Sequence, residues 1–189
     1  MDTTTQRRKI NKANADNSFY YRGAGKFKIA LWYITSNIFF TSFFNPLSSV
    51  RIRLLKLFGA KVGVKCNLKA GVFIRYPWNL EMGDYVAMGE YAFIDNVGKI
   101  IIGNHVTISQ GGMILSASHN YKDPAFNITV HTTILEDGVW ICSRAVVCPG
   151  LTCGSHSILT VSSIATKNLE PYFIYSGNPA VSIRERIIE

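Results

Sequence analysis

Hydrophobic residues recur every six positions through most of this 189-residue chain. From Val62 onward, neither the 3.6-residue period of an α-helix nor the two-residue alternation of a β-strand describes the sequence well. Small or apolar residues also stand at most positions four residues after the start of each hexad. The apolar residues that start the hexads are Val62, Leu68, Ile74, Met82, Met88, Ile94, Ile102, Ile108, Ile114, Leu135, Ile141, Val147, Cys153, Leu159 and Ala165.

A short fixed period is typical of a solenoid, in which stacked coils share a core that no single repeat could bury. Three hexads make one turn of a triangular prism, so residues 61–170 are predicted to form about five coils of short parallel strands. Slips of two residues around Trp78 and Ile101 are interpreted as insertions at corners. The alternative, an antiparallel β-sandwich, predicts hairpin turns and two-residue alternation in place of a period of six.

Residues 1–60 are predicted to hold a tail and two helical segments ahead of the coils. No charged residue lies between Lys28 and Arg51, but polar residues interrupt this stretch and Pro46 ends it. A membrane span is therefore disfavoured. We expect a helix that docks on the protein itself or lies on a membrane, with docking preferred.

A second helix is predicted between a cap at Asn45, with Pro46 at its first position, and a stop at Gly59. Its apolar face would comprise Val50, Leu54, Leu55, Leu57 and Phe58. Residues 171–189 are expected to form a tail with a short C-terminal helix. Only residues 1–15 have the composition of a disordered segment.

The net charge of +8 is unevenly distributed. Residues 1–80 hold fourteen Lys or Arg against Asp2 and Asp16, whereas residues 81–189 hold six basic and ten acidic residues. The basic part is interpreted as a solvated face or as a surface that contacts anionic membrane. No nucleic-acid-binding motif accompanies it, so we expect no nucleic-acid partner.

The four cysteines form no CxxC pair and no signal peptide precedes them. The sequence therefore indicates reduced thiols in a cytoplasmic protein, with a peripheral position at the inner face of the membrane as a hypothesis from charge alone.

The hexad pattern is interrupted once, at residues 116–133, by SASHNYKDPAFNITVHTT. Connections longer than about 12–15 residues without structure are uncommon in compact domains and are often functional. His119 stands near the start of this extended loop, next to the coil that ends near Leu115. The loop is therefore where we expect the chemistry of the protein.

Several motifs resemble those of a known family. IGNHVTISQGG, LEDGVWICSRAVVCPGLTCG and YSGNPAVSIRERI are similar to the hexapeptide-repeat acyltransferases, in particular the maltose and galactoside acetyltransferase group. RLLKLFGAKVG, RYPWNL and SASHNY resemble the branch of colanic-acid and exopolysaccharide acetyltransferases. The resemblance implies a mainly β fold built on a left-handed parallel β-helix, a homotrimer, and acetyl-CoA bound between neighbouring prisms.

Within this resemblance His119 matches the histidine that serves as general base. Acetyl transfer to a hydroxyl requires removal of its proton, and histidine, with an ordinary pKa of about 6.5, suits that role near neutral pH. A surface histidine in a loop is the alternative. His105 and His156 are expected to be solvated, and His131 is a weaker candidate for contact with the acceptor. The spacing of the four histidines argues against a zinc site, so no metal is expected.

The family places an asparagine near the acceptor sugar, where this chain has Phe93. Asp95 and Asn96, just beyond it, could supply the hydrogen bonds to the acceptor or could be ordinary corner residues. The residues that align with the coenzyme A groove of the family are Trp140, Ser143, Thr166, Lys167 and Arg184. A second arginine of the family falls on Val181. Lys167 and Arg184 as plain surface charges remain the alternative.

The resemblance implies an acetyl-CoA-dependent O-acetyltransferase that acts on a sugar or lipid-linked glycan hydroxyl in exopolysaccharide or cell-surface glycan synthesis. Direct attack in a ternary complex needs no covalent intermediate. Two alternatives stay open, namely acetylation of an antibiotic or serine, and a β-helix that serves only as an assembly scaffold.

Overall fold

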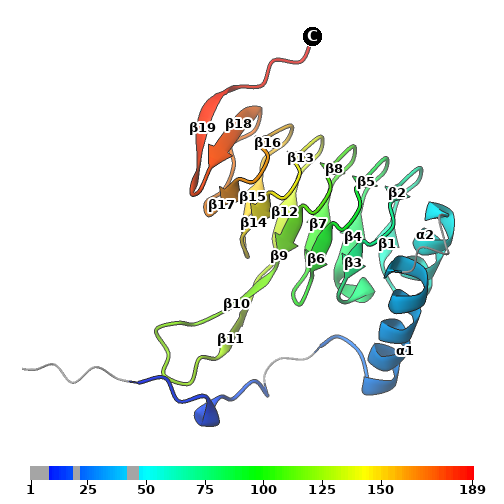
Figure 1. Ribbon diagram of the computed structural model, residues 1–189, viewed down its shortest axis with the longest axis vertical. Helices are drawn as coiled ribbons and strands as arrows, with labels where there is room; N and C mark the ends of the chain where they lie inside the picture. Colours follow the sequence, from blue (N-terminus) through cyan, green and yellow to red (C-terminus); the bar gives the residue numbers. More distant parts are fainter. Residues whose placement is uncertain (1–8, 19–21, 42–46) are drawn as a thin grey trace, which may run out of the picture.

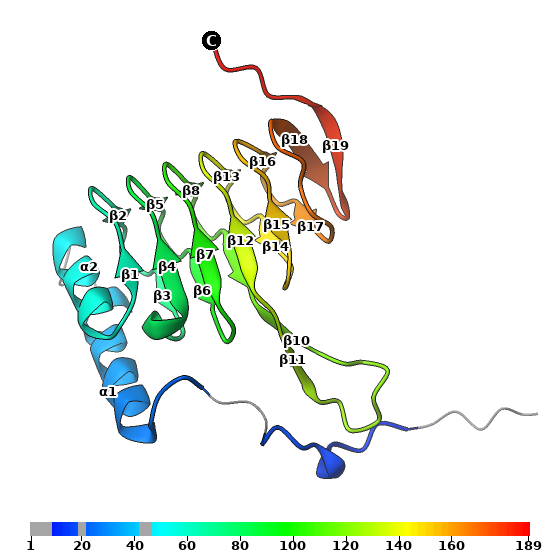
Figure 2. The ribbon, with the colours of Figure 1, turned by 180° about the vertical axis from the view of Figure 1, so that it is seen from behind.

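The computed structural model describes residues 9–18, 22–41 and 47–189, and most of them form a triangular column of stacked parallel strands (Figures 1 and 2). Each coil contributes one short strand to each of three sheets. The first sheet contains β1 (Lys61–Val62), β4 (Leu80–Met82), β7 (Ile100–Ile102), β12 (Thr133–Leu135) and β15 (Thr152–Cys153). The fold is therefore the predicted parallel β-solenoid.

The second and third sheets complete the prism. The second contains β2 (Asn67–Leu68), β5 (Ala87–Met88), β8 (Thr107–Ile108), β13 (Trp140–Ile141), β16 (Ile158–Leu159), β18 (Phe173–Gly177) and β19 (Ala180–Glu185). The third contains β3 (Phe73–Ile74), β6 (Phe93–Asp95), β9 (Met113–Leu115), β14 (Val146–Val147) and β17 (Ile164–Ala165). The insertion at Trp78 is a short 3-10 turn, η3 (Pro77–Asn79).

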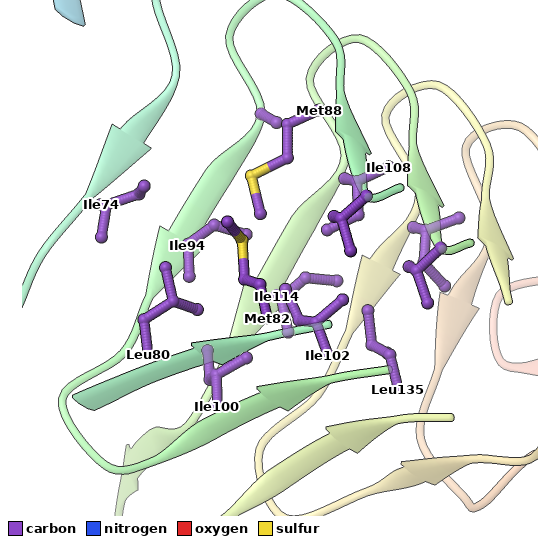
Figure 3. Packing of buried hydrophobic residues seen from close by; sticks show 14 of the residues in the cluster. Ile74, Leu80, Met82, Met88, Ile94, Ile100, Ile102, Ile108, Ile114 and Leu135 are labelled. Atoms are coloured by element: carbon purple, nitrogen blue, oxygen red, sulfur yellow. The ribbon is translucent and has the colours of Figure 1, made fainter. Parts of the chain in front are cut away.

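The residues that start the predicted hexads stack on one another through the column. Met82 pairs in register with Ile102, Ile102 with Leu135, and Leu135 with Cys153. Their side chains point inward and are buried, and Figure 3 shows residues of this kind filling the interior, with Leu80 and Ile100 beside them. Glycine follows several of them because the next coil comes too close for a side chain. A Cβ at Gly63 would lie 2.5 Å from the Gly83 carbonyl oxygen.

The column has about six turns, one more than predicted. Leu169 forms a bridge with Cys153, and Tyr175 in β18 continues the ladder above Leu159. This turn escaped the hexad count because Leu169 follows Ala165 by four residues, where the period requires six.

The predicted C-terminal helix is absent, and that prediction is wrong. Residues 173–185 form the antiparallel pair β18 and β19, joined at Asn178 and Pro179. β18 pairs with β16, whose backbone would otherwise be an open sheet edge. The available hydrogen bonds of that edge therefore decide the structure of this segment, and local helix propensity does not.

The first helical segment docks on the N-terminal end of the column, as preferred from the sequence (Figures 1 and 2). α1 (Lys26–Ser36) continues into a π-helical turn, η2 (Asn37–Thr41). The Trp32 side chain is completely buried and its Nε1 donates to the Ile74 carbonyl at 3.0 Å. Among the residues described, no helix is long and apolar enough to cross a membrane.

The second helix, α2 (Ser48–Leu57), starts at Ser48 and ends before Gly59, which has a φ of 102°. The predicted cap at Asn45 and the proline at 46 lie outside the described residues. Leu55 is buried as predicted, but Leu57 is 78% exposed, so its place on the buried face was wrong.

A charged residue replaces Leu57 on the buried face of α2. Arg51 is almost fully buried, and it donates from Nε to the Phe39 carbonyl at 3.0 Å and from Nη1 to the Leu68 carbonyl at 3.3 Å. Nothing in the hydrophobic pattern distinguishes it from the exposed Arg53. Its guanidinium satisfies backbone carbonyls at the open end of the column, which an apolar side chain could not do.

The interruption after Leu115 is a β-hairpin rather than an irregular loop. β10 (Ala117–His119) and β11 (Ile128–Val130) pair antiparallel, with Ala117 opposite Val130 and His119 opposite Ile128. Figure 1 shows this hairpin projecting from the side of the column.

Candidate active site

His119 occupies the last position of β10, and its ring is held at two places. Nδ1 lies 2.9 Å from the Phe126 carbonyl oxygen, and the imidazole stacks on the Phe126 ring with centroids 4.5 Å apart and an angle of 11° between the planes. A carbonyl oxygen can only accept a hydrogen bond, so Nδ1 carries the proton. In the neutral ring Nε2 then has a free lone pair and can accept a proton.

The tip of the hairpin determines where the Phe126 carbonyl points. Asp123 accepts from the Ala125 amide at 2.9 Å and from the Asn127 side chain at 2.8 Å. Phe126 itself has a φ of 55°, a left-handed conformation that residues with a side chain adopt rarely. This turn brings the Phe126 carbonyl back toward His119. His119 is exposed, so surrounding side chains do not fix its orientation by burial. Its contacts with Phe126 orient the ring instead.

Residues 9–18 lie along the tip of the hairpin, although the composition of residues up to 15 predicts disorder (Figures 1 and 2). The Lys12 ammonium stands 4.9 Å from the centroid of the Phe126 ring that stacks on His119. Three hydrogen bonds tie the two segments together: Asn11 N to Pro124 O, Asp16 N to Asn127 Oδ1, and Ile128 N to Asn17 Oδ1. Sequence analysis missed this contact, because polar residues that bind a distant hairpin leave no periodic signal.

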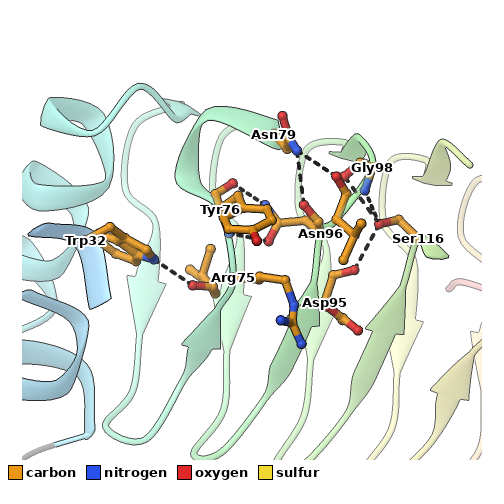
Figure 4. Close-up of polar contacts among 10 residues, drawn as sticks. Trp32, Arg75, Tyr76, Asn79, Asp95, Asn96, Gly98 and Ser116 are labelled. Atoms are coloured by element: carbon orange, nitrogen blue, oxygen red, sulfur yellow. Dashed lines mark hydrogen bonds and ion pairs between the residues drawn. The ribbon is translucent and has the colours of Figure 1, made fainter. Parts of the chain in front are cut away.

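Asp95 ends β6 and lies in register with Leu115, the last residue before the hairpin. Its carboxylate accepts a hydrogen bond from Arg75 Nε and remains partly exposed. Ser116 fixes the root of the hairpin to the same corner, because its Oγ donates to the Asp95 carbonyl at 2.9 Å (Figure 4). The structure thus brings the Asp95 carboxylate to the base of the hairpin that carries His119.

Asn96 has a different environment from its neighbour. Its side chain is fully buried, with Oδ1 accepting from the Tyr76 amide at 2.9 Å and Nδ2 donating to the Tyr76 carbonyl (Figure 4). Both ends of the amide are therefore used by the corner of the preceding coil. Of the two acceptor candidates, Asn96 is therefore a structural residue of the corner. The Asp95 carboxylate is partly exposed, so a ligand could reach it.

His131 leaves the hairpin on the opposite side from His119. Neighbouring residues of a strand point to opposite faces, and His131 follows Val130, which pairs with Ala117 on the face of His119. The His131 ring lies close to Gly150, where an added Cβ would approach its Cγ to 3.3 Å. The structure does not bring His131 and His119 together.

His105 and His156 sit at corners of the coils. They stack on Tyr85 and Tyr172, with ring centroids 4.9 and 4.8 Å apart. Within the described ranges, no three His, Cys, Asp or Glu residues are grouped as a metal site would require.

Four of the five residues that align with the coenzyme A groove line two separate hollows beside β19, and Ser143 lines neither of them. Trp140 and Arg184 line a hollow with a volume of about 520 Å³. Thr166 and Lys167 line another of about 330 Å³, together with Val181, where the second family arginine is replaced. Lys167 and Arg184 thus both border hollows large enough for part of a ligand.

Two of these residues are held by the coil below them. Trp140 Nε1 donates to Ser109 Oγ at 2.9 Å, and Ser143 Oγ donates to Gln110 Oε1 at 3.1 Å. Both bonds lock side chains on the outer surface of the column. In a single chain these side chains and His119 are supplied by different elements.

Known proteins resemble this chain in sequence and in architecture. No family model matches the chain. The putative colanic acid biosynthesis acetyltransferase WcaF of Escherichia coli (strain K12) is 34% identical over 167 residues, which cover 88% of this chain and 92% of that protein. A chloramphenicol acetyltransferase of Klebsiella aerogenes is 30% identical over 146 residues, covering 65% of this chain and 70% of that protein.

The solved structures with the same fold include a galactoside acetyltransferase in complex with coenzyme A. It superimposes with a TM-score of 0.74 at 22% identity and covers 84% of this chain and 80% of that one. At this identity the likeness is one of fold.

Proposed function

Because this chain belongs to the hexapeptide-repeat acetyltransferase family, we propose that it transfers the acetyl group of acetyl-CoA to a sugar hydroxyl with His119 as general base. The observation that carries the proposal is the hydrogen bond from His119 Nδ1 to the Phe126 carbonyl. It leaves Nε2 as the atom that receives the proton. The ring is oriented before the acceptor arrives, which lowers the entropic cost of reaching a productive geometry.

The reaction proceeds by direct attack. Nε2 of His119 takes the proton of the acceptor hydroxyl as its oxygen bonds to the thioester carbonyl carbon. The bond between that carbon and sulfur then breaks, and the imidazolium returns its proton to the departing thiolate of coenzyme A. The described thiols do not serve as nucleophiles in this scheme. Burial raises the pKa of the Cys142 and Cys148 thiols, which disfavours the reactive thiolate.

The acceptor is proposed to be a sugar of an exopolysaccharide or cell-surface glycan, carried on a lipid in the cytoplasm. The similarity to a putative colanic acid biosynthesis acetyltransferase supports this choice. Asp95, at the root of the hairpin, is proposed to accept hydrogen bonds from the sugar hydroxyls. His131 and Asn96 are not assigned to the acceptor site, because the His131 ring lies near Gly150, away from His119, and the Asn96 side chain is fully buried.

Coenzyme A is proposed to bind along the column through Trp140, Ser143, Thr166, Lys167 and Arg184, with the two cations near its phosphates. A homotrimer would place the hairpin of one chain beside the hollows of the next. The separation of His119 from the coenzyme A candidates along one chain supports that arrangement, since a neighbouring chain could complete the site.

The test measures thiol release from acetyl-CoA with a panel of sugars. Replacing a general base typically costs about 10²–10⁴-fold in rate, so His119→Ala should lose at least about 100-fold of the activity. His105→Ala is the matched control, because His105 is an exposed histidine that also stacks on an aromatic ring. Equal rates for wild type and His119→Ala would remove the assignment of the base.

Chloramphenicol belongs in the same panel. The similarity to a chloramphenicol acetyltransferase favours an antibiotic as the second candidate acceptor. If thiol is released with chloramphenicol and with none of the sugars, the acceptor is the antibiotic and not a sugar. If the protein binds acetyl-CoA but releases no thiol with any acceptor, the result would support the alternative that the β-helix serves only as an assembly scaffold.

A further inference from the structure

Helix α1 has two apolar faces, and the part of the chain that the structure describes covers one of them. Ile29 and Trp32 are buried, and Trp32 belongs to the core of the column. On the other side Phe27, Leu31 and Ile34 are exposed, followed by Ile38 in η2, and Phe27 reaches 83% exposure. Their spacing of four, three and four residues places them along one face of a helix. The solvent-facing side of this element is therefore an apolar stripe.

The stripe continues onto α2. Leu57 is 78% exposed, and it lines an apolar hollow of about 380 Å³ together with Phe27, Leu31 and Phe58. Leu57 lies outside the core although its sequence position predicts burial. Two helices thus contribute to one apolar surface at the N-terminal end of the column, which Figure 2 shows at the opposite end from β19.

The two helices that form this surface carry basic residues and no acidic ones, and Lys28 lines the apolar hollow itself. Between Asp16 and Glu81 the sequence contains ten Lys or Arg and no Asp or Glu. Lys26, Arg53 and Lys56 are exposed on α1 and α2. Among the residues that the structure describes, no salt bridge engages any of these three.

We propose that this face, made of Phe27, Leu31, Ile34, Ile38 and Leu57 with the cations Lys26, Arg53 and Lys56, binds the surface of an anionic lipid bilayer. A helix with exposed apolar side chains and flanking cations suits the boundary between headgroups and acyl chains. The cations are attracted to anionic headgroups. A second copy of the same face would bring like charges together, which disfavours self-association through it.

This inference goes beyond acetyl transfer and does not depend on it. A lipid-linked acceptor, which is part of the proposed function, would be delivered at the surface to which the face binds. Vesicle binding can be measured with no acceptor and no acetyl-CoA present. Failure of one proposal therefore leaves the other standing.

The experiment is co-sedimentation of the full chain with vesicles of phosphatidylcholine, with and without phosphatidylglycerol. Binding is expected to the mixed vesicles at low salt and to decline as salt screens the charges. The double variant Phe27→Ser with Ile34→Ser removes apolar insertion, and we expect binding to weaken by at least about tenfold. Lys26→Glu with Arg53→Glu should remove the preference for phosphatidylglycerol.

Val161→Ser is the matched control, because Val161 is 63% exposed at a corner remote in sequence from both helices. It should bind vesicles like wild type. Acetyl-CoA binding and circular dichroism report whether each variant is folded, and the charge variant tests the proposal if the serine variant does not fold.

Absence of binding to anionic vesicles by wild type would overturn the proposal. So would equal binding by wild type and the serine variant. A change of oligomeric mass in the serine variant, measured by sedimentation equilibrium, together with no vesicle binding by wild type, would instead make the face an interface between copies of the chain.

Discussion

Adjacent residues Asp95 and Asn96 should respond to substitution in opposite ways. Asn96→Ala removes the bond that the Tyr76 amide donates to Oδ1 at 2.9 Å and one of two bonds to the Tyr76 carbonyl, which still accepts from the Asn79 amide at 2.9 Å. Asn96 is fully buried, so water does not readily replace it. The Tyr76 amide alone is left without a partner, and an unsatisfied buried backbone group costs about 1–3 kcal/mol, centrally about 2 kcal/mol.

That loss corresponds to a measurable change in thermal stability. For a chain of this size about 1 kcal/mol shifts Tm by roughly 2–4 °C, so Asn96→Ala should lower Tm by about 4–8 °C. The KM for the acceptor should be unchanged at temperatures where the variant is folded. Asn96 is expected to act on the corner of the coil and not on the sugar.

Asp95→Asn is the matched variant. It keeps the shape of the side chain and an oxygen that can accept from Arg75, so Tm should change by only a few degrees, roughly what a partly exposed ion pair contributes. The KM for the acceptor should rise, since the variant loses the ionised oxygen that is proposed to accept from the sugar hydroxyls.

Differential scanning fluorimetry and steady-state kinetics on the same preparations check both predictions. The reasoning would be refuted if Asn96→Ala raised the acceptor KM while leaving Tm unchanged. It would also be refuted if Asp95→Asn lowered Tm as much as Asn96→Ala.

Two further substitutions test the electrostatics and the placement of the base. The Asn104 amide donates to Asp137 at 2.7 Å and lowers the pKa of this carboxyl below 3.8, so its stabilisation is full above that pH and is lost as pH falls through the lowered value. Asp137→Asn should therefore flatten the fall of Tm as the pH drops through and below the ordinary pKa of an Asp, about 3.9, and an identical pH dependence of Tm would contradict this. Phe126→Leu keeps the carbonyl that binds His119 but removes the stacked ring, so kcat should fall by about three- to tenfold while KM for acetyl-CoA stays constant. Tyr121→Leu, on the same hairpin, serves as the control, and equal kcat values for the two variants would deny the ring a positioning role.

The core of the column could be read from the sequence because each hexad repeats one local requirement. The starting residue must be apolar, since its side chain enters a shared interior, and glycine can follow where the next coil leaves no space, as at Gly63. A requirement that recurs every six residues is visible without any knowledge of distant contacts. All fifteen predicted starting residues lie at matching register positions in the three sheets.

The ends of the column were harder to predict because they are defined by open sheet edges. The backbone groups of the first and last coils must be satisfied by whatever segment reaches them. At one end Arg51 donates to the Leu68 carbonyl, and at the other β18 adds a strand beside β16. Neither solution repeats along the chain, so neither leaves a period that sequence analysis could detect.

The candidate site likewise has features that the sequence predicted and features that only the structure revealed. The interruption after Leu115 and the residue type at position 119 were enough to locate the expected base. The partner that orients it, the Phe126 carbonyl, is a backbone group that every residue carries, and only the turn at the hairpin tip directs it toward His119. Asp95 and Asn96 look alike in sequence, and burial alone separates them.

By itself, the sequence determined the repeating coils, the point where they are interrupted and the histidine at that point, because these depend on side-chain identity at regular positions. Only the tertiary structure decided which polar groups are buried, how the imidazole is oriented and which side of α1 stays exposed. Those properties depend on contacts between residues far apart in the chain, such as Trp32 with Ile74 and Asn17 with Ile128.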